Sequence, residues 1–198
     1  AIEAARIALK YRTPVILLSD GYLANGSEPW LLPDPSTLPD ISVEFATEPN
    51  HTADDGSAEF WPYLRDPETL ARPWAIPGTP GLMHRVGGIE KEDGTGNISY
   101  EPANHSAMVH LRAAKIAGIA NDIPLANIVG DEDADVCVLG WGSTWAAIDA
   151  AVQITRRNGT KVAWIHLTHL NPMPRNLGDL LRKFRHILVP ELNLGQLC

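Results

Sequence analysis

Residues 135–198 alternate between strand and helix patterns, and this alternation constrains the fold more than any other feature of the sequence. The apolar run Val136–Leu139 is typical of a strand buried on both faces. The predicted elements after it are a tight turn at 140–144, a helix that ends at 156–159, a strand at 161–165, a helix at 177–184 and a strand at 187–189. This order predicts an α/β fold, in which a mostly parallel sheet carries helices on both faces. Because the pattern stops partway through a further turn, we expect the functional protein to be larger than this chain.

Composition narrows the class of protein. The chain has 198 residues, 44% of them hydrophobic and 20% charged, which is typical of a globular protein. Its net charge of -8 argues against nonspecific binding to nucleic acid or to an anionic membrane. No apolar run approaches the roughly 20 residues that span a bilayer. The first residues lack the layout of a secretory signal, so we expect a cytoplasmic protein.

The two cysteines, Cys137 and Cys198, provide neither a disulfide framework nor a metal or iron–sulfur motif. Cys137 lies inside a predicted strand, where a free cysteine acts as a small buried apolar side chain. We therefore expect a reducing compartment and no cysteine chemistry.

The first 25 residues predict the end of an α/β unit. Residues 1–11 have helical spacing of apolar side chains, and Pro14 ends the helix. The run Val15–Leu18 lacks polar alternation and predicts a strand buried on both faces. Asp20 follows it, at the edge where open α/β sheets bind ligands.

The middle of the chain differs in composition. Ten of the 16 prolines lie between Pro29 and Pro80, together with three tryptophans, which indicates an ordered but irregular segment instead of a linker. A helix is expected near 106–120, with Lys115 extending to solvent along its apolar stem. The predicted division is 1–25, a long irregular connection at 26–130, and a partial α/β domain at 131–198.

The turn after Val136–Leu139 partly resembles a dinucleotide-binding fingerprint. Gly140 and Gly142 match the first two glycines of the fingerprint, but the third small residue is replaced by Trp145. The acidic residue expected after the second strand is also missing, since His166 follows Ile165. We therefore predict a tight turn, with Ser143 or Thr144 as the helix cap.

Two other patterns contain residue types that bind metals. Glu92-Asp93-Gly94, with Asn121-Asp122 further on, resembles the magnesium and thiamine diphosphate motif, but lacks its leading glycine and second asparagine. We interpret residues 93–97 as a surface turn. The histidine pairs have no acidic or cysteine partner at ligand spacing; they are His105 with His110 and His166 with His169. The sequence thus assigns no catalytic, cofactor-binding or metal-binding residue.

Longer stretches of the sequence indicate a protein family more specifically than these motifs. Five of them occur in order: YRTPVILLSDGYL at 11–23, RPWAIPGTPG at 72–81, GWGST at 140–144, HLTHLNPMP at 166–174 and PELNLGQL at 190–197. Together they resemble the alpha subunit of the 2-oxoacid:ferredoxin oxidoreductases, in particular the 2-oxoglutarate type. The resemblance covers nearly the whole chain.

The resemblance implies a function for the complete enzyme. Such enzymes oxidatively decarboxylate a 2-oxoacid with coenzyme A, giving acyl-CoA, CO2 and reduced ferredoxin. Residues 1–25 would end the domain that holds the thiamine pyrimidine, and 131–198 would begin a domain similar to the carboxyl-terminal domain of transketolase. Thiamine diphosphate, Mg²⁺ and the [4Fe-4S] cluster would be held mainly by a beta subunit, in a hetero-oligomer that uses ferredoxin and CoA. This chain would be a fragment with an assembly role, inactive alone.

Two alternatives from other classes stay open. The chain could be a non-catalytic α/β interaction module whose irregular segment 26–105 serves as a partner surface. It could also be a separate nucleotide-binding enzyme with its ligand at the turn 140–143. Co-purification of a brown beta-type subunit favours the oxidoreductase reading, and nucleotide binding favours the last one.

Overall fold

A computed structural model describes all residues 1–198 of the chain, which form two compact units. The first unit contains Ala1–Leu17 and Leu32–Ile119, and the second contains Leu18–Leu31 and Ala120–Cys198. The domain boundaries drawn from the sequence, at 25/26 and 130/131, stay a prediction.

The second unit is built on a four-stranded sheet in the order β3-β5-β4-β6. Its strands are β3 (Val129–Gly130), β4 (Val136–Trp141), β5 (Ala163–Leu167) and β6 (His186–Leu188). β4 runs parallel to both β5 and β6, whereas β3 pairs antiparallel with β5. The sheet is therefore mixed and mostly parallel, and the predicted α/β class is confirmed.

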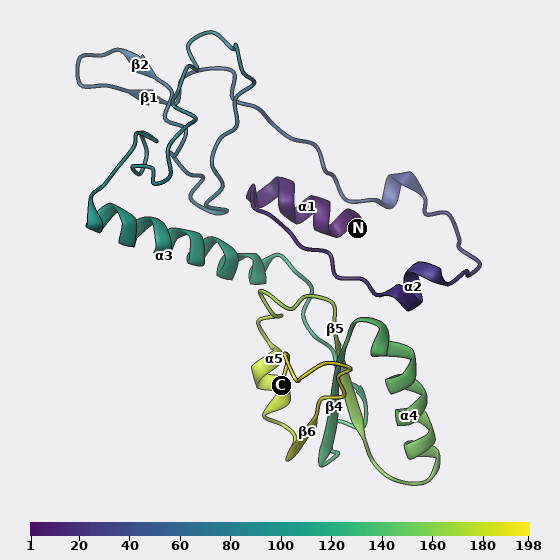
Figure 1. The fold of residues 1–198 in the computed structure, drawn as a ribbon. Coiled ribbons are helices and arrows are strands. Elements are labelled where there is room, and N and C mark those ends of the chain that lie inside the picture. The colour runs from purple at the N-terminus through teal and green to yellow at the C-terminus, as the bar shows by residue number, and fades with distance from the viewer. The chain divides into compact units, whose positions relative to one another are not determined.

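Alternate residues of β4 and β5 supply two hydrophobic clusters, one on each face of the sheet. On one face, Cys137, Leu139 and Ile165 pack with Leu177 of α5 (Leu177–Leu181). The other cluster consists of Ile148 and Val152 of α4 (Trp145–Arg157), together with Val138, Val162 and Trp164. Figure 1 shows α4 and α5 on opposite sides of the central strands. Both faces are covered, as expected for parallel strands that lack polar alternation.

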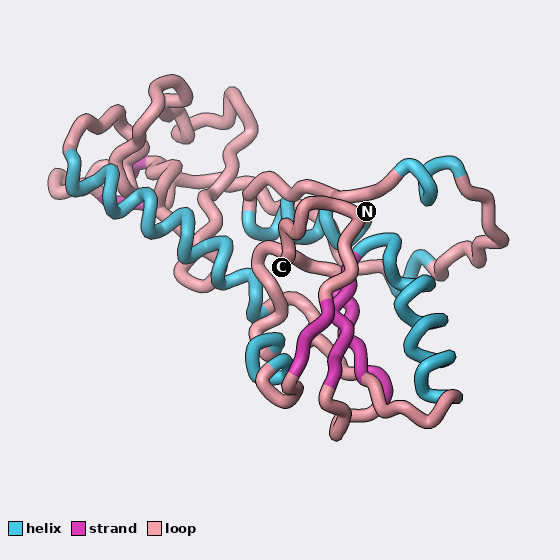
Figure 2. Tube along the Cα trace, turned by 60° about the horizontal axis from the view of Figure 1, so that its bottom comes forward, coloured by secondary structure: helices cyan, strands magenta, loops and turns pink.

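The first unit has little regular structure, as the loops of Figure 2 show. Its elements are α1 (Ile2–Tyr11), a short 3-10 turn (Pro35–Thr37), the hairpin of β1 (His51–Thr52) and β2 (Ala58–Glu59), and α3 (Pro102–Gly118). Buried apolar side chains come from the helices and the irregular segment alike, among them Ile7, Tyr11, Phe60, Leu82 and Met108. At 17 residues α3 is the longest helix, and no helix is both long and apolar enough to cross a membrane.

One prediction for these elements was wrong. Val15–Leu18 forms no strand, and Ile16 is 84% exposed. An apolar run becomes a strand only when a neighbouring strand takes up its hydrogen bonds, and none pairs with it here. The helix expected near 106–120 is confirmed as α3, although it begins earlier, at Pro102, because proline at the first helical position loses no hydrogen bond. After Asp20, a short helix α2 (Gly21–Asn25) follows in the second unit.

The antiparallel pairing of β3 requires a glycine, which gives a stability prediction. Gly130 has a φ of 102°, and a Cβ atom there would lie 2.6 Å from the carbonyl oxygen of Val162. Gly159 has a φ of 84° but open space around it. We expect Gly159→Ala to cost about 1 kcal/mol through backbone strain alone, and Gly130→Ala to cost clearly more because the clash is with backbone. Urea unfolding followed by far-UV circular dichroism measures the stability of both variants. Equal losses of stability would contradict the close approach of Gly130 to the backbone of Val162.

Candidate functional site

The turn singled out by the sequence connects β4 to α4 through a 3-10 turn, Gly142–Thr144. Gly140 permits close packing, since a Cβ atom there would lie 2.2 Å from Cδ1 of Ile148 on α4. Thr144 is the N-cap residue of α4, one of the two predicted, but it makes no capping hydrogen bond because its hydroxyl donates to the carbonyl oxygen of Trp141. Ser143 instead hydrogen-bonds the carboxylate of Asp20, which lowers the pKa of that carboxyl. The turn is thus held by internal hydrogen bonds.

The histidines do not converge on one site. His105 contacts Glu90, and His110 contacts the carbonyl oxygen of Ser106. His166 lies on β5, where burial lowers its pKa. No group of three or more His, Cys, Asp or Glu side chains in the chain is arranged to hold a metal ion.

The segment compared with the magnesium motif is a turn. Gly94 and Gly96 both have positive φ, and the hydroxyl of Thr95 donates to Glu92. Asn121 belongs to the second unit, whereas these residues belong to the first. A turn is present at 93–97 as predicted, but Gly94 and Gly96 are buried against Trp61 and Pro62, so it does not lie wholly at the surface.

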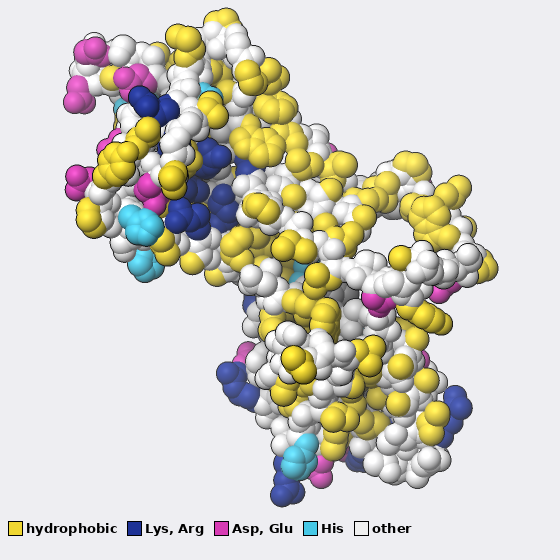
Figure 3. All heavy atoms as spheres, viewed as in Figure 1, with side chains coloured by type: hydrophobic (Ala, Val, Ile, Leu, Met, Phe, Trp, Pro, Cys, Tyr) yellow, Lys and Arg dark blue, Asp and Glu magenta, His cyan; other side chains and the backbone are white.

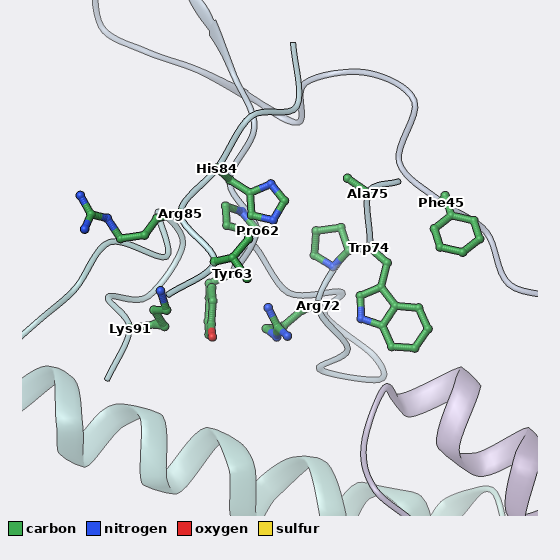
Figure 4. Close-up of a pocket in the computed structure, with 11 residues that line it drawn as sticks. Phe45, Pro62, Tyr63, Arg72, Trp74, Ala75, His84, Arg85 and Lys91 are labelled. Carbon is green, nitrogen blue, oxygen red and sulfur yellow. The ribbon is translucent and has the colours of Figure 1, made fainter. Parts of the chain in front are cut away.

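A basic pocket in the first unit is the strongest candidate site. It has a volume of about 330 Å³, and its wall is formed by the irregular segment alone. The residues that line it are Phe45, Pro62, Tyr63, Arg72, Pro73, Trp74, Ala75, His84, Arg85, Val86 and Lys91. In the view of Figure 4, Tyr63 lies between Lys91 and Arg72, and the guanidinium of Arg85 points away from them.

Side-chain hydrogen bonds to backbone fix the two central cations. The amide of Asn104, on α3, donates to the carbonyl oxygen of Lys91 at 2.8 Å and accepts from the N–H of Asp93 at 3.0 Å. The guanidinium of Arg12 donates to the carbonyl oxygens of Arg72 and Glu44. The helices α1 and α3 therefore position a pocket whose wall has almost no secondary structure of its own.

Further cations surround the pocket. Arg72 lies over the ring of Tyr63, with its guanidinium carbon 4.4 Å from the ring centre, and Arg65 lies 5.8 Å from the same ring. Arg12 lies 5.1 Å from the ring centre of Trp74. Figure 3 shows Lys and Arg side chains gathered between α3 and the loops of this unit. Cation–π contacts orient the guanidinium groups but leave their charge uncompensated.

Two of the cations are buried without a carboxylate partner. Lys91 is 6% exposed and Lys115, on α3, is 8% exposed; they are the only buried charged residues of the chain. Neither they nor Arg12, Arg65 or Arg72 form an ion pair within 4.0 Å. Burial, together with the nearby arginines, lowers the pKa of Lys115 to about 8. Burial also lowers the pKa of Arg65, although Asp93 partly offsets the effect.

This arrangement suits an anion, and the sequence did not indicate it. The cations come from positions between 12 and 115, with no shared motif or spacing, in a chain of net charge -8. The expectation that Lys115 extends to solvent was wrong, because the irregular segment covers its face of α3. The phrase at 72–81 contains Arg72 and Trp74, and was the one local signal near the pocket.

Comparison with known proteins then places the chain. It is 54% identical over 199 residues to the 2-oxoglutarate oxidoreductase subunit KorA of Mycobacterium tuberculosis, which matches all of this chain and 29% of that protein. The chain matches a segment of a 2-oxoacid oxidoreductase alpha subunit. This confirms the resemblance found in the sequence.

Other relatives agree. The alpha subunit of 2-oxoacid:ferredoxin oxidoreductase 1 from Aeropyrum pernix is 30% identical over 99% of the chain and 30% of its own length. The 2-oxoglutarate:ferredoxin oxidoreductase of Magnetococcus marinus, solved with 2-oxoglutarate, coenzyme A and succinyl-CoA bound, superposes with a TM-score of 0.82 at 31% identity, covering 96% of this chain and 32% of that one. The chain thus spans about a third of these proteins, and no protein-family model matches it.

Lys115 generates a prediction about pH. Its pKa is about 8 when folded and has the ordinary value of 10.5 when unfolded. Between these values the unfolded chain holds more protons, so the free energy of unfolding rises with pH across this window. Lys115→Met removes the buried charge. We expect it to raise the free energy of unfolding at pH 7 by roughly 1–3 kcal/mol, and to make the increase of that free energy with pH smaller.

Urea titrations by circular dichroism in phosphate-free buffer, from pH 7 to 10.5, measure this. Lys183→Met is the matched control, because that lysine is exposed and paired with Glu132. The prediction is contradicted if Lys115→Met is less stable than the unmodified chain at pH 7 and its free energy of unfolding rises with pH as steeply. That result would show that the folded chain already stabilises the charged ammonium group.

The cysteines generate a second prediction. Cys137 is fully buried, and burial raises the pKa of its thiol to about 11, whereas Cys198 is exposed. Because the thiolate is the reactive form, iodoacetamide at pH 8 should modify Cys198 alone in the folded chain and both thiols in urea. Mass spectrometry of tryptic peptides reads this out; rapid native labelling of Cys137 would mean that the sheet opens.

Proposed function

We propose that the chain is the part of a 2-oxoacid:ferredoxin oxidoreductase alpha subunit that supports assembly, and that the complete enzyme converts a 2-oxoacid, 2-oxoglutarate in particular, and CoA to acyl-CoA and CO2 while reducing ferredoxin. The observation that carries the proposal is the identity of 54% along the whole chain with KorA. The structural likeness to the Magnetococcus enzyme supports it independently of sequence phrases.

We further propose the partners that the resemblance implies. A beta subunit completes the enzyme and holds most of the thiamine diphosphate, Mg²⁺ and [4Fe-4S] cluster, and ferredoxin and CoA act through that complex. The chain's own contribution is a rigid α/β body, the sheet of the second unit, with apolar clusters on both faces. We assign no catalytic step to a residue of this chain.

The experiment replaces the matched segment of Mycobacterium tuberculosis KorA with this chain and co-expresses the chimera with the beta subunit of that enzyme. Reduction of methyl viologen by 2-oxoglutarate and CoA is then measured. We expect the chimera to co-purify with a brown beta subunit and to keep at least about a tenth of the parent rate, because the two segments share more than half of their residues. The isolated 198-residue chain should give no turnover.

The controls separate the alternatives. A chimera carrying Gly130→Ala tests whether binding of the beta subunit requires the folded sheet, since a Cβ atom at that position would clash with the backbone of Val162. A chimera that folds but fails to bind the beta subunit would contradict the assembly role and favour an interaction module with another partner. Turnover by the isolated chain would contradict the proposal directly.

A further inference from the structure

The basic pocket holds hydrogen-bond donors that the protein does not use. The guanidinium of Arg72 is half-buried and donates to no protein acceptor. Lys91 donates to the carbonyl oxygen of Gly87, which leaves two of its three N–H groups. Arg65 does not line the pocket, but its Nε is buried nearby without a hydrogen-bond partner. Buried donors are normally satisfied, so this set indicates an acceptor that is not part of the chain.

The charge of that acceptor follows from the number of cations. Arg72 and Lys91 line the pocket. Burial, and after it the charge of Arg72, lowers the pKa of both Arg12 and Arg65. Burial and the three arginines together lower the pKa of Lys115. The carboxylates of Glu44 and Asp93 act on Arg12 and Arg65 only from outside ion-pair distance. A single carboxylate would bring one negative charge, whereas a phosphate monoester brings close to two. A polyanion therefore offsets more of the repulsion.

Other side chains already contact the aromatic rings of the pocket. Arg72 lies over Tyr63, and Arg12 and Phe45 both lie near the ring of Trp74. The pocket therefore recognises charge, and the planar fork of Arg72 suits two oxygens of one phosphate group. Its volume of about 330 Å³ is ample for a diphosphate.

We propose that this pocket binds the diphosphate group of a small polyanion, with Arg72 and Lys91 as direct ligands and Arg12, Arg65 and Lys115 supplying positive potential. The site stands on the geometry of the first unit alone and goes beyond the proposed function. The diphosphate has two possible sources, free inorganic diphosphate or the diphosphate bridge of a nucleotide-type cofactor such as coenzyme A.

Isothermal titration calorimetry of the 198-residue chain with inorganic pyrophosphate tests the proposal, at fixed ionic strength in phosphate-free buffer. We expect saturable binding that Arg72→Gln weakens by about tenfold or more, because charge-assisted hydrogen bonds are lost. Arg72→Lys keeps the positive charge but lacks the planar guanidinium. Its affinity for pyrophosphate should lie between those of the unmodified chain and of Arg72→Gln. Arg112→Gln is the matched control: it removes a positive charge from an exposed side chain of α3, and should change the affinity by no more than about twofold.

Three further measurements complete the test. Lys91→Gln gives an independent loss of affinity should Arg72→Gln unfold, which circular dichroism reports. Titration with 2-oxoglutarate compares the affinity of the pocket for a dicarboxylate with its affinity for pyrophosphate. Displacement of pyrophosphate by coenzyme A but not by pantetheine identifies a nucleotide-type source, and no displacement by either identifies free diphosphate.

Wild-type affinity in both Arg72→Gln and Lys91→Gln would overturn the proposal, as would tighter binding of 2-oxoglutarate than of pyrophosphate. Because the readout is binding to the chain without a beta subunit, a negative result leaves the proposed enzyme function unaffected. Loss of chimera activity, in turn, has no bearing on pyrophosphate binding.

Discussion

Backbone groups outside regular structure need hydrogen-bond partners, and in this chain three asparagine side chains meet part of that need between segments distant in sequence. Each of three asparagines accepts from one backbone N–H and donates to a backbone carbonyl of a distant segment, as a paired strand would. Asn50 does so with Trp61, Asn176 with Ala126, and Asn104 with Lys91 and Asp93. The long irregular segment is held in place by such contacts, and Asn104 extends the same device to the basic pocket.

The sheet of the second unit obeys a different constraint. Strands buried on both faces need helices that approach closely, and Gly140 allows Ile148 of α4 to lie where a side chain would otherwise be. The glycine that first suggested a nucleotide turn thus serves packing between helix and strand. Asp20 and Ser143 then join the turn to the start of α2.

These two constraints explain what the sequence predicted and what it did not. Periodicity is local, so it predicted β4, α4, β5, α5 and β6 nearly to their ends. It missed β3, whose two residues gain their structure from β5 and from the positive φ of Gly130. It placed a strand at 15–18 because an apolar run does not reveal whether a neighbouring strand exists. The basic pocket was beyond sequence reasoning, since tertiary contacts alone bring Arg12, Arg72 and Lys115 together.

The distribution of charge, not its sum, decides what the chain can bind. In the second unit the acidic stretch 131–133 is paired residue by residue, with Arg156, Lys183 and Lys161. The first unit has ion pairs at Arg6 and Arg112, but around the basic pocket it does the opposite. It gathers arginines and lysines there and keeps carboxylates out of ion-pair distance from Arg12, Arg65, Arg72, Lys91 and Lys115. Long-range attraction, which nucleic acids and membranes require, follows the net charge of -8. A small anion inside a pocket responds instead to the few charges within several ångströms, where screening by solvent is weakest. A chain that repels polyanionic surfaces can therefore still carry a strong site for one polyanionic group.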